Sequence, residues 1–362
     1  MRRARTSGLA IVTTLLVLGA VGVALARADD TQQGSAYLEP TDSFLERHNL
    51  NLMLDDRMHA MVMPGDKRPL PDVRKEPEAP PPPPKGPPLP LHTLEGTSGG
   101  AMTGMAYFAN AGPPGTTIGM PSASYTFLVA GSKHVHSIAI SEVLFRRIEL
   151  SYAWNRIDLG SFPNDVEALT GLTIRDHVYL HNFNVRGILI EENSFDLPLP
   201  QIVGGVHFKF AQGLDQLDGQ AGHGPSSIGY DDEDGVDFTL MASKTWQDPC
   251  LKRPLITSLG VRFTRSSQLG WLGFGDDYKA NLEANIAWVP TDWLAVAYEF
   301  RQKRDQYDTI PHLVKGEDNW HTILVAWLIN DRASLAAVYG HLGDIANTTE
   351  NRAFGLQFKY EF

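Results

Sequence analysis

The sequence has almost no cysteine, and this excludes two kinds of scaffold. Cys250 is the single cysteine among 362 residues, so the chain can form neither an intramolecular disulfide nor a cysteine-based metal site. The sequence also lacks zinc-binding spacings, phosphate-binding glycine loops and a nucleophile elbow. It therefore contains no motif for a cofactor, and we expect a protein that is not an enzyme.

Positive charge is also scarce. Lys and Arg together number 31 against 42 Asp and Glu, which gives a net charge of −11. The first 28 residues hold four arginines and no acid, so the rest of the chain carries −15. Such an acidic chain argues against nucleic acid as a partner.

Long apolar runs are confined to the start of the chain. The basic stretch MRRAR precedes an apolar run over residues 9–25, which small residues follow. This pattern predicts a signal peptide over residues 1–28, with a permanent helical anchor as the alternative. No later apolar run has the length of a membrane-spanning helix. If the mature chain enters a membrane, it does so as strands.

Residues 29–98 differ in composition from the remainder and end in a proline-rich stretch. Five consecutive prolines at 80–84 favour an extended polyproline II conformation and exclude a packed core element. We interpret this region as a periplasmic arm that could bind a periplasmic envelope partner. Its MHAMVM stretch is a weak candidate for a copper(I) site, because thioethers and imidazole are soft ligands, and the alternative is an apolar docking patch. The candidate ligands are Met58, His59, Met61 and Met63.

The chain closes on AFGLQFKYEF, in which apolar and polar residues alternate strictly. This period of two is typical of a strand with one apolar and one polar face. Eleven similar segments precede it, several of them with Trp or Tyr near the ends of the apolar face, and the even count suits a barrel that closes on itself. We therefore predict an all-β fold over residues 120–362, a transmembrane antiparallel up-and-down β-barrel of about 12 strands. The expected strands are 121–130, 136–144, 147–158, 177–190, 200–210, 234–246, 254–265, 278–289, 292–302, 319–329, 332–342 and 352–362.

The stretch LHTLEGTSGGAMTGMAYFAN, residues 91–110, lies outside that count. Gly99 and Gly100 permit a sharp bend in it. We assign residues 99–119 as a glycine-containing segment that forms either an extra strand or a segment inside the lumen, and we favour the lumen.

Several phrases resemble a Gram-negative bacterial family of secreted, outer-membrane proteins of unknown function. They are LHTLEGTSGGAMTGMAY, DHVYLHNFNVRGI, DDEDGVDFTLMASKTW, GWLGFGDD and the closing LQFKYEF. The resemblance covers residues 91–362 and implies an outer-membrane location, with the lipid bilayer as surroundings and no catalytic residue to transfer. The terminal pattern is also similar to the signal read by the barrel assembly machinery, which implies that Phe358, Tyr360 and Phe362 direct insertion.

Charged side chains of both signs fall on the polar face of the expected strands. A charge-lined interior suits a water-filled passage for small polar solutes or ions. The alternative is a closed structural or adaptor barrel in which these charges pair, since 12 strands are intermediate between filled and open barrels. The candidate lumen residues are Glu149, Arg186, His207, Lys209, Arg262, Lys279, Glu283, Glu299 and Arg301, with Lys359 and Glu361 on the last strand.

Two further patterns give weaker hypotheses. The acidic run at Asp231, Asp232 and Asp234 is a candidate calcium site, although its spacing departs from an EF-hand and a solvated loop tip is the alternative. His177 and His181 raise the hypothesis of an outer-membrane hydrolase, but no motif marks a nucleophilic serine beside them.

Overall fold

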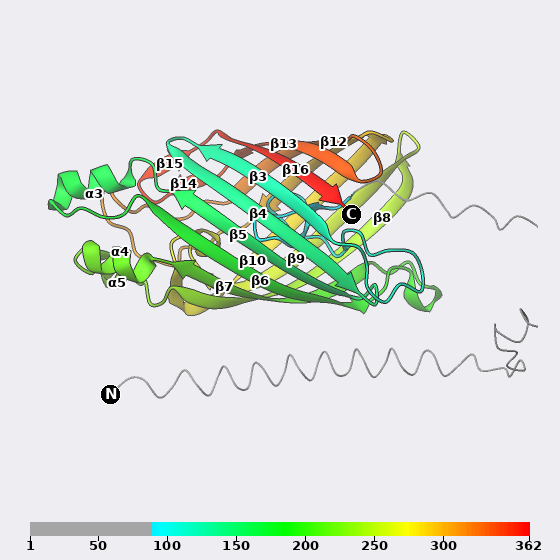
Figure 1. Ribbon diagram of the computed structural model, residues 1–362, viewed down its shortest axis with the longest axis horizontal. Coiled ribbons are helices and arrows are strands. Elements are labelled where there is room, and N and C mark those ends of the chain that lie inside the picture. Colours follow the sequence, from blue (N-terminus) through cyan, green and yellow to red (C-terminus); the bar gives the residue numbers. More distant parts are fainter. Residues whose placement is uncertain (1–88) are drawn as a thin grey trace, which may run out of the picture. The chain divides into compact units, whose positions relative to one another are not determined.

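Twelve antiparallel strands close into a barrel in the computed structural model, which describes residues 89–362 (Figure 1). The signal peptide, most of the proline-rich arm and the candidate copper ligands lie outside the described residues. Neighbours along the chain pair with one another, and β16 pairs with β3 from Glu361 opposite Ser122 to Ala353 opposite Ala130. The barrel strands are β3 (Ser122–Ala130), β4 (Lys133–Leu144), β5 (Ile148–Asp158), β6 (His177–Ile190), β7 (Gln201–Gln212), β8 (Asp234–Cys250), β9 (Arg253–Ser266), β10 (Phe274–Thr291), β11 (Leu294–Arg301), β12 (Trp320–Leu328), β13 (Ala333–His341) and β16 (Ala353–Glu361).

All twelve expected strands are confirmed, and the largest differences lie at strand ends. β8 continues past Trp246 to Cys250, and β10 begins at Phe274. In both strands the pairing register shifts between the expected part of the strand and the additional residues. Such irregularities interrupt the period of two on which the sequence-based boundaries depend.

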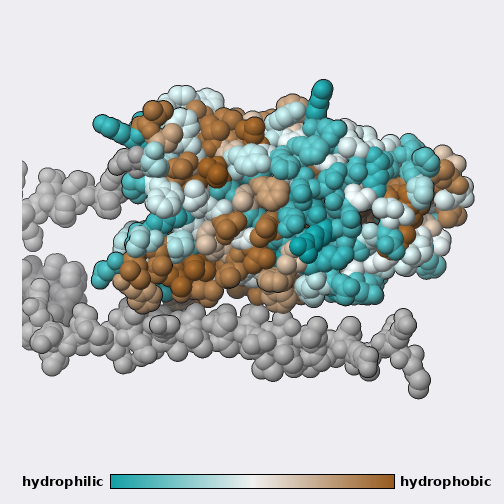
Figure 2. Space-filling view, turned by 180° about the vertical axis from the view of Figure 1, so that it is seen from behind, coloured by the Kyte–Doolittle hydropathy of each residue, from teal (hydrophilic) through white to brown (hydrophobic). Residues whose placement is uncertain are grey.

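The exterior of the barrel carries apolar side chains and the interior carries polar ones. In β12 the side chains of Ile323, Val325 and Trp327 are exposed, although the sequence was apolar on both faces there. Apolar side chains form patches on the barrel wall in Figure 2, with hydrophilic side chains between them and toward one end. A closed sheet with an apolar exterior leaves no backbone group unpaired in hydrocarbon. The structure therefore defines a transmembrane β-barrel.

The two ends of the barrel differ. One end, the long-loop end, carries α3 (Phe162–Thr170), α4 (Leu214–Gln220), α5 (Gly224–Ser227), η3 (Gln268–Gly270) and the hairpin of β14 (Gly343–Ile345) with β15 (Thr348–Glu350). The other, the short-turn end, carries the C-terminus and tight connections apart from the loop with η2 (Ser194–Asp196) (Figure 1). Long loops at one end and short turns at the other are typical of outer-membrane barrels.

No helix in residues 89–362 is both long enough and apolar enough to cross a bilayer.

The lipid-facing surface can be tested at the middle of β9. Leu259 is 61% exposed there, and placing arginine on the lipid face near the bilayer midplane costs about 2–4 kcal/mol. We expect Leu259→Arg to lower the unfolding free energy of the protein in lipid vesicles by this amount. The control is Leu251→Arg in the tight turn after β8, where the side chain is 80% exposed and the change should be within about 0.5 kcal/mol. Equal effects of the two variants would contradict the membrane assignment.

Candidate functional site

A segment of the chain occupies the barrel lumen. We call residues 89–110 the luminal segment; all its residues from 90 to 106 are buried. Its two short strands, β1 (Leu91–His92) and β2 (Ser98–Gly99), pair only with each other. Within the expected segment of residues 99–119, the part up to residue 110 belongs to the luminal segment and adds no strand to the barrel sheet, whereas residues 113–118 are mostly exposed. Residues 90–98 also belong to the lumen, although the sequence boundary placed them in the arm.

The luminal segment enters and leaves at the short-turn end. At its start, the Lys359 ammonium donates to the carbonyl oxygen of Pro90 over 2.6 Å. At its finish, the side-chain amide of Asn110 donates to the carbonyl oxygen of Phe362 over 3.3 Å. Both contacts involve β16 or the residue that follows it, so the segment is a loop that folds back inside the barrel.

The Glu299 carboxylate from β11 holds the turn of the luminal segment. It accepts hydrogen bonds from the backbone N–H groups of Ala101 at 3.1 Å and Thr103 at 2.9 Å, and also from that of Met102. The wall comes so close that a Cβ on Gly100 would lie 2.1 Å from the Glu299 Oε1. Only glycine fits this position, because any side chain would displace the turn from the carboxylate.

The Arg186 guanidinium from β6 holds the returning part. It pairs with the Glu149 carboxylate of β5, with the Arg186 Nε 2.9 Å from the Glu149 Oε1. The same guanidinium donates to the carbonyl oxygens of Met105 at 2.7 Å and Ser98 at 3.1 Å. The Ser98 hydroxyl in turn donates to Glu149. One wall ion pair therefore binds both arms of the luminal segment.

Glu95 connects the luminal segment to three wall cations, which we call the cation cluster: Lys209 of β7, Arg262 of β9 and Arg301 of β11. Its carboxylate lies 2.5 Å from the Lys209 Nζ, 3.1 Å from the Arg262 Nη1 and 2.7 Å from the Arg301 Nη2. All four side chains are nearly inaccessible to solvent. Because buried charges are tolerated only when paired, these contacts strongly favour the seated position of the segment.

The cluster also controls the ionisation of Glu95, which lies outside the spanning strands. Burial alone would raise the pKa of its carboxyl, but Arg262, Lys209 and Arg301 hold that pKa well below its usual range. Glu95 is therefore ionised throughout the neutral and mildly acidic range, and its contacts with the cluster persist there.

Two wall carboxylates complete this network. Asp237 of β8 lies 2.6 Å from Lys209 and 3.1 Å from Arg262, and Glu283 of β10 lies 2.6 Å from Arg262 and 3.0 Å from Arg301. Successive inward positions on five adjacent strands thus alternate in charge, in the order β7 to β11. The wall contributes three positive charges and two negative charges, and Glu95 supplies the third negative charge.

Eight of the nine candidate lumen residues are buried inside the barrel, as are Lys359 and Glu361. His207 is held by Asn184 and Thr239, with 2.8 Å from each ring nitrogen to the partner oxygen. Lys279 differs: it is partly exposed near the long-loop end of β10, and its ammonium donates to the carbonyl oxygen of Asp305. It has the inward parity but lies beyond the buried part of the lumen.

The sequence reasoning missed Glu95, His92 and Asp237. Glu95 stands alone as an acid in LHTLEGTSGG, so a charge within a segment expected in the lumen was the available signal. The His92 ring lies 2.9 Å from the Ser124 hydroxyl and 2.8 Å from the Ser141 hydroxyl. Nothing in the sequence indicates these partners.

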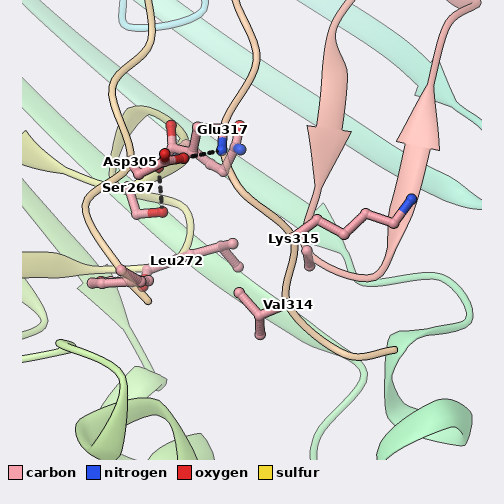
Figure 3. Close-up of a pocket in the computed structure, with 9 residues that line it drawn as sticks. Ser267, Leu272, Asp305, Val314, Lys315 and Glu317 are labelled. Atoms are coloured by element: carbon pink, nitrogen blue, oxygen red, sulfur yellow. Dashed lines mark hydrogen bonds between the residues drawn. The ribbon is translucent and has the colours of Figure 1, made fainter. Parts of the chain in front are cut away.

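The long-loop end is covered by its own connections. A pocket there is lined by residues of the loops after β9, β11 and β13 (Figure 3). In it, the Ser267 hydroxyl donates to the Glu317 carboxylate over 2.7 Å. Glu317 also lies 2.5 Å from the Lys303 ammonium, while burial lowers the Lys303 pKa and Glu317 opposes that change. Loops thus cover this end, and the luminal segment occupies the interior below them, with residues 90–106 buried.

The weaker site hypotheses receive no support. No group of three His, Cys, Asp or Glu side chains in the described part of the chain is arranged to hold a metal ion, and the calcium site at Asp231, Asp232 and Asp234 stays a prediction. Asp231 instead lies 3.4 Å from the Arg265 guanidinium. His181 faces outward and its Nδ1 lies 2.9 Å from the Tyr152 hydroxyl, not beside a serine.

The terminal residues lie on the closing strand as expected. Phe358 and Phe362 are roughly half exposed on the barrel exterior, and Tyr360 is partly buried. Their role as an insertion signal stays a prediction.

Fold and site together define a transmembrane β-barrel whose polar lumen is filled by its own N-terminal segment. The chain belongs to the family described as "Protein of unknown function (DUF3034)", whose model matches residues 90–359. The match begins at the luminal segment and ends on the last strand, so it covers the complete unit.

Comparison with other proteins adds little. No curated protein matches the chain. Among solved structures, the chain is similar to the KdgM porin at 13% identity and a TM-score of 0.41, covering 67% of this chain and 99% of that one. For the outer membrane protein Omp33 of Acinetobacter baumannii the values are 10%, 0.40, 68% and 99%. At such scores these likenesses carry no argument beyond the strand topology itself.

The position of the luminal segment against the barrel wall can be tested at Gly100. We expect Gly100→Ala to lower the unfolding free energy by about 1–3 kcal/mol, the usual cost of overpacking, because the added methyl group meets Glu299 and Asn285. Thermal unfolding and protease accessibility of residues 91–105 measure the effect. The matched control is Gly219→Ala in α4, where a Cβ meets nothing within 4 Å. If protease does not cut the luminal segment of the Gly100→Ala variant any faster than that of the wild-type protein, the described position of the segment against Glu299 is wrong.

Proposed function

We propose that this protein is an outer-membrane channel for small polar solutes or ions, closed in the present conformation by the luminal segment. One observation carries the proposal. The segment's backbone–backbone hydrogen bonds are formed within itself, as between Thr93 N–H and Thr97 O at 2.8 Å and between Leu94 N–H and Ala101 O at 3.0 Å, except at its last residue, where Asn110 O accepts from Met120 N–H at 3.4 Å. Its contacts with the wall involve side chains. The segment can therefore leave its position in the lumen without breaking the strand pairing that closes the barrel.

The composition of the lumen wall supports a hydrated interior. Several buried polar atoms have no hydrogen-bond partner among residues 89–362, including both amide atoms of Asn155 and Asn182. Buried polar groups without partners are costly, and internal water usually satisfies them. An interior that binds water in this way offers a polar wall to hydrated solutes once the segment moves.

The orientation follows from the difference between the two ends. Outer-membrane barrels have short periplasmic turns and long outer loops, so we assign the short-turn end to the periplasm. The luminal segment then opens toward the periplasm, and the proline-rich arm that precedes it in the sequence is proposed to be periplasmic. A periplasmic partner of that arm could in this way influence the position of the segment.

A closed adaptor barrel is the second candidate function. It is favoured by the number of buried contacts that hold the luminal segment, above all those of Glu95, Glu299 and Arg186. In that case the segment would never leave, and the arm would be the functional part. We propose no enzymatic activity in either case.

A reversible crosslink tests whether the segment controls the passage. A Cβ on Gly96 would lie 2.9 Å from the Ala153 Cβ of β5, and Gly96 has a φ of +90°. The two positions are adjacent, and the segment must move outward from β5 at Gly96 to reach the separation of about 3.5–4.5 Å that disulfides span. We expect Gly96→Cys with Ala153→Cys, in a Cys250→Ser background, to stop solute efflux from proteoliposomes when oxidised. Reduction should restore the efflux of small polar solutes.

The control is Ala153→Cys in the same background, whose efflux should not depend on the redox state. Equal efflux from the oxidised and reduced double variant would show that the segment does not control passage. An absence of efflux from every form, with the barrel folded, would favour the adaptor barrel.

A further inference from the structure

We propose that the cation cluster of Lys209, Arg262 and Arg301 is a binding site for a carboxylate-bearing solute, and that Glu95 occupies this site while the channel is closed. The inference rests on the proposed function for its role in transport. As a binding site, it depends only on the geometry of the cluster.

The first argument is that the cations and the carboxylate of this site come from different parts of the chain. The three cations come from three different strands of the wall, whereas the carboxylate that joins them comes from the luminal segment. The guanidinium groups of Arg262 and Arg301 and the ammonium of Lys209 all donate to this one carboxylate. Charge-assisted bonds of this kind are the usual means by which proteins recognise carboxylates.

The second argument is the charge balance. Other lumen cations have a wall carboxylate of their own: Arg186 pairs with Glu149 at 2.9 Å and Lys359 with Glu361 at 2.6 Å. In the cation cluster, three cations share Asp237 and Glu283. When Glu95 leaves, the three cations of the cluster share only Asp237 and Glu283 and so retain one excess positive charge among themselves. This local excess favours an anion over a cation at the cluster. Glu299, also on β11, loses the N–H donors of the luminal segment in the same step, so the preference belongs to the cluster and not to the whole wall.

The third argument is spare hydrogen-bonding capacity. The Arg301 side chain is only 2% exposed, and its Nε and Nη1 have no hydrogen-bond partner among the described residues. Donors directed into a buried site without acceptors are costly. A solute with more oxygen atoms than the single Glu95 carboxylate offers acceptors for these donors.

These arguments give an exchange mechanism without covalent chemistry. A carboxylate solute replaces the Glu95 carboxylate with a group of the same charge and shape, so no buried cation is left unpaired during the exchange. Release of Glu95 removes the ion pairs of the luminal segment with β7, β9 and β11, and leaves the hydrogen bonds with Glu299 of β11 and Gln201 of β7 as the remaining contacts with β7 and β11. The solute that passes is then also the ligand that favours the open conformation.

Chemical rescue tests the site in the full-length protein. Glu95→Ala removes the carboxylate and leaves room for a small anion, whereas Glu95→Gln removes the charge and keeps the room filled. We expect both variants to melt below the wild-type protein. Sodium acetate should raise the melting temperature of Glu95→Ala by about 3 °C when present at roughly ten times its dissociation constant.

Three controls make the rescue specific. Wild-type protein should not respond to acetate, because Glu95 fills the site, and Glu95→Gln should not respond, because the amide fills it. Glu149→Ala vacates a carboxylate beside one cation instead of three and should respond less. Equal acetate responses in all four proteins, or none in Glu95→Ala, would overturn the proposed site.

A second measurement does not depend on the folding of the variants. Reversal potentials of wild-type openings in a potassium chloride gradient should show preference for the anion, and acetate should carry current or block the chloride current. Openings that prefer potassium would overturn the inference and leave the channel proposal intact. Acetate rescue of Glu95→Ala without openings in any protein would support the binding site and contradict the channel proposal.

Discussion

The structure depends on one constraint, which is that no backbone polar group can remain unpaired in hydrocarbon. This requires β16 to pair with β3 along its whole length, from Glu361 to Ala353. Closure with twelve strands leaves an interior too wide for wall side chains alone to fill and too narrow for a large open pore. The luminal segment, a loop of the same chain, fills the space that the wall side chains leave.

The interactions inside the barrel follow from that filling. Charges on the inward face would be hydrated in an open pore, but the luminal segment removes them from solvent and makes pairing obligatory. Glu299 and Arg186 bind backbone groups of the segment, whereas Glu95 supplies a charge that the wall lacks. The seated segment is thus stabilised by electrostatics, and a competing anion can exchange with it.

Much of the barrel was predictable because lipid outside and polar groups inside impose a strict period of two on each strand. The inward position of charges such as Arg262 follows from the same alternation. The partners of these charges do not follow from the alternation. The pairing register of the strands and the path of the luminal segment decide that residues 95, 209, 262 and 301 meet. The stretch from Leu91 was recognised as distinct, but the boundary of the arm was placed after residue 98, since Leu91 and His92 follow directly on proline-rich sequence without a boundary signal. Lys279 shows the limit of parity, which gives the face of a side chain but not its depth.

The central claim is that the luminal segment, and not the barrel wall, closes the lumen. Residues 90 and 110 both lie at the short-turn end, so a short glycine–serine linker can replace residues 91–109 and leave the strand pairing intact. Single-channel recording of this variant beside the intact protein tests the claim most directly. The account predicts steady, large openings for the variant and rare or small ones for the intact protein. Equal conductance of the two folded proteins, whether open or silent, would contradict it.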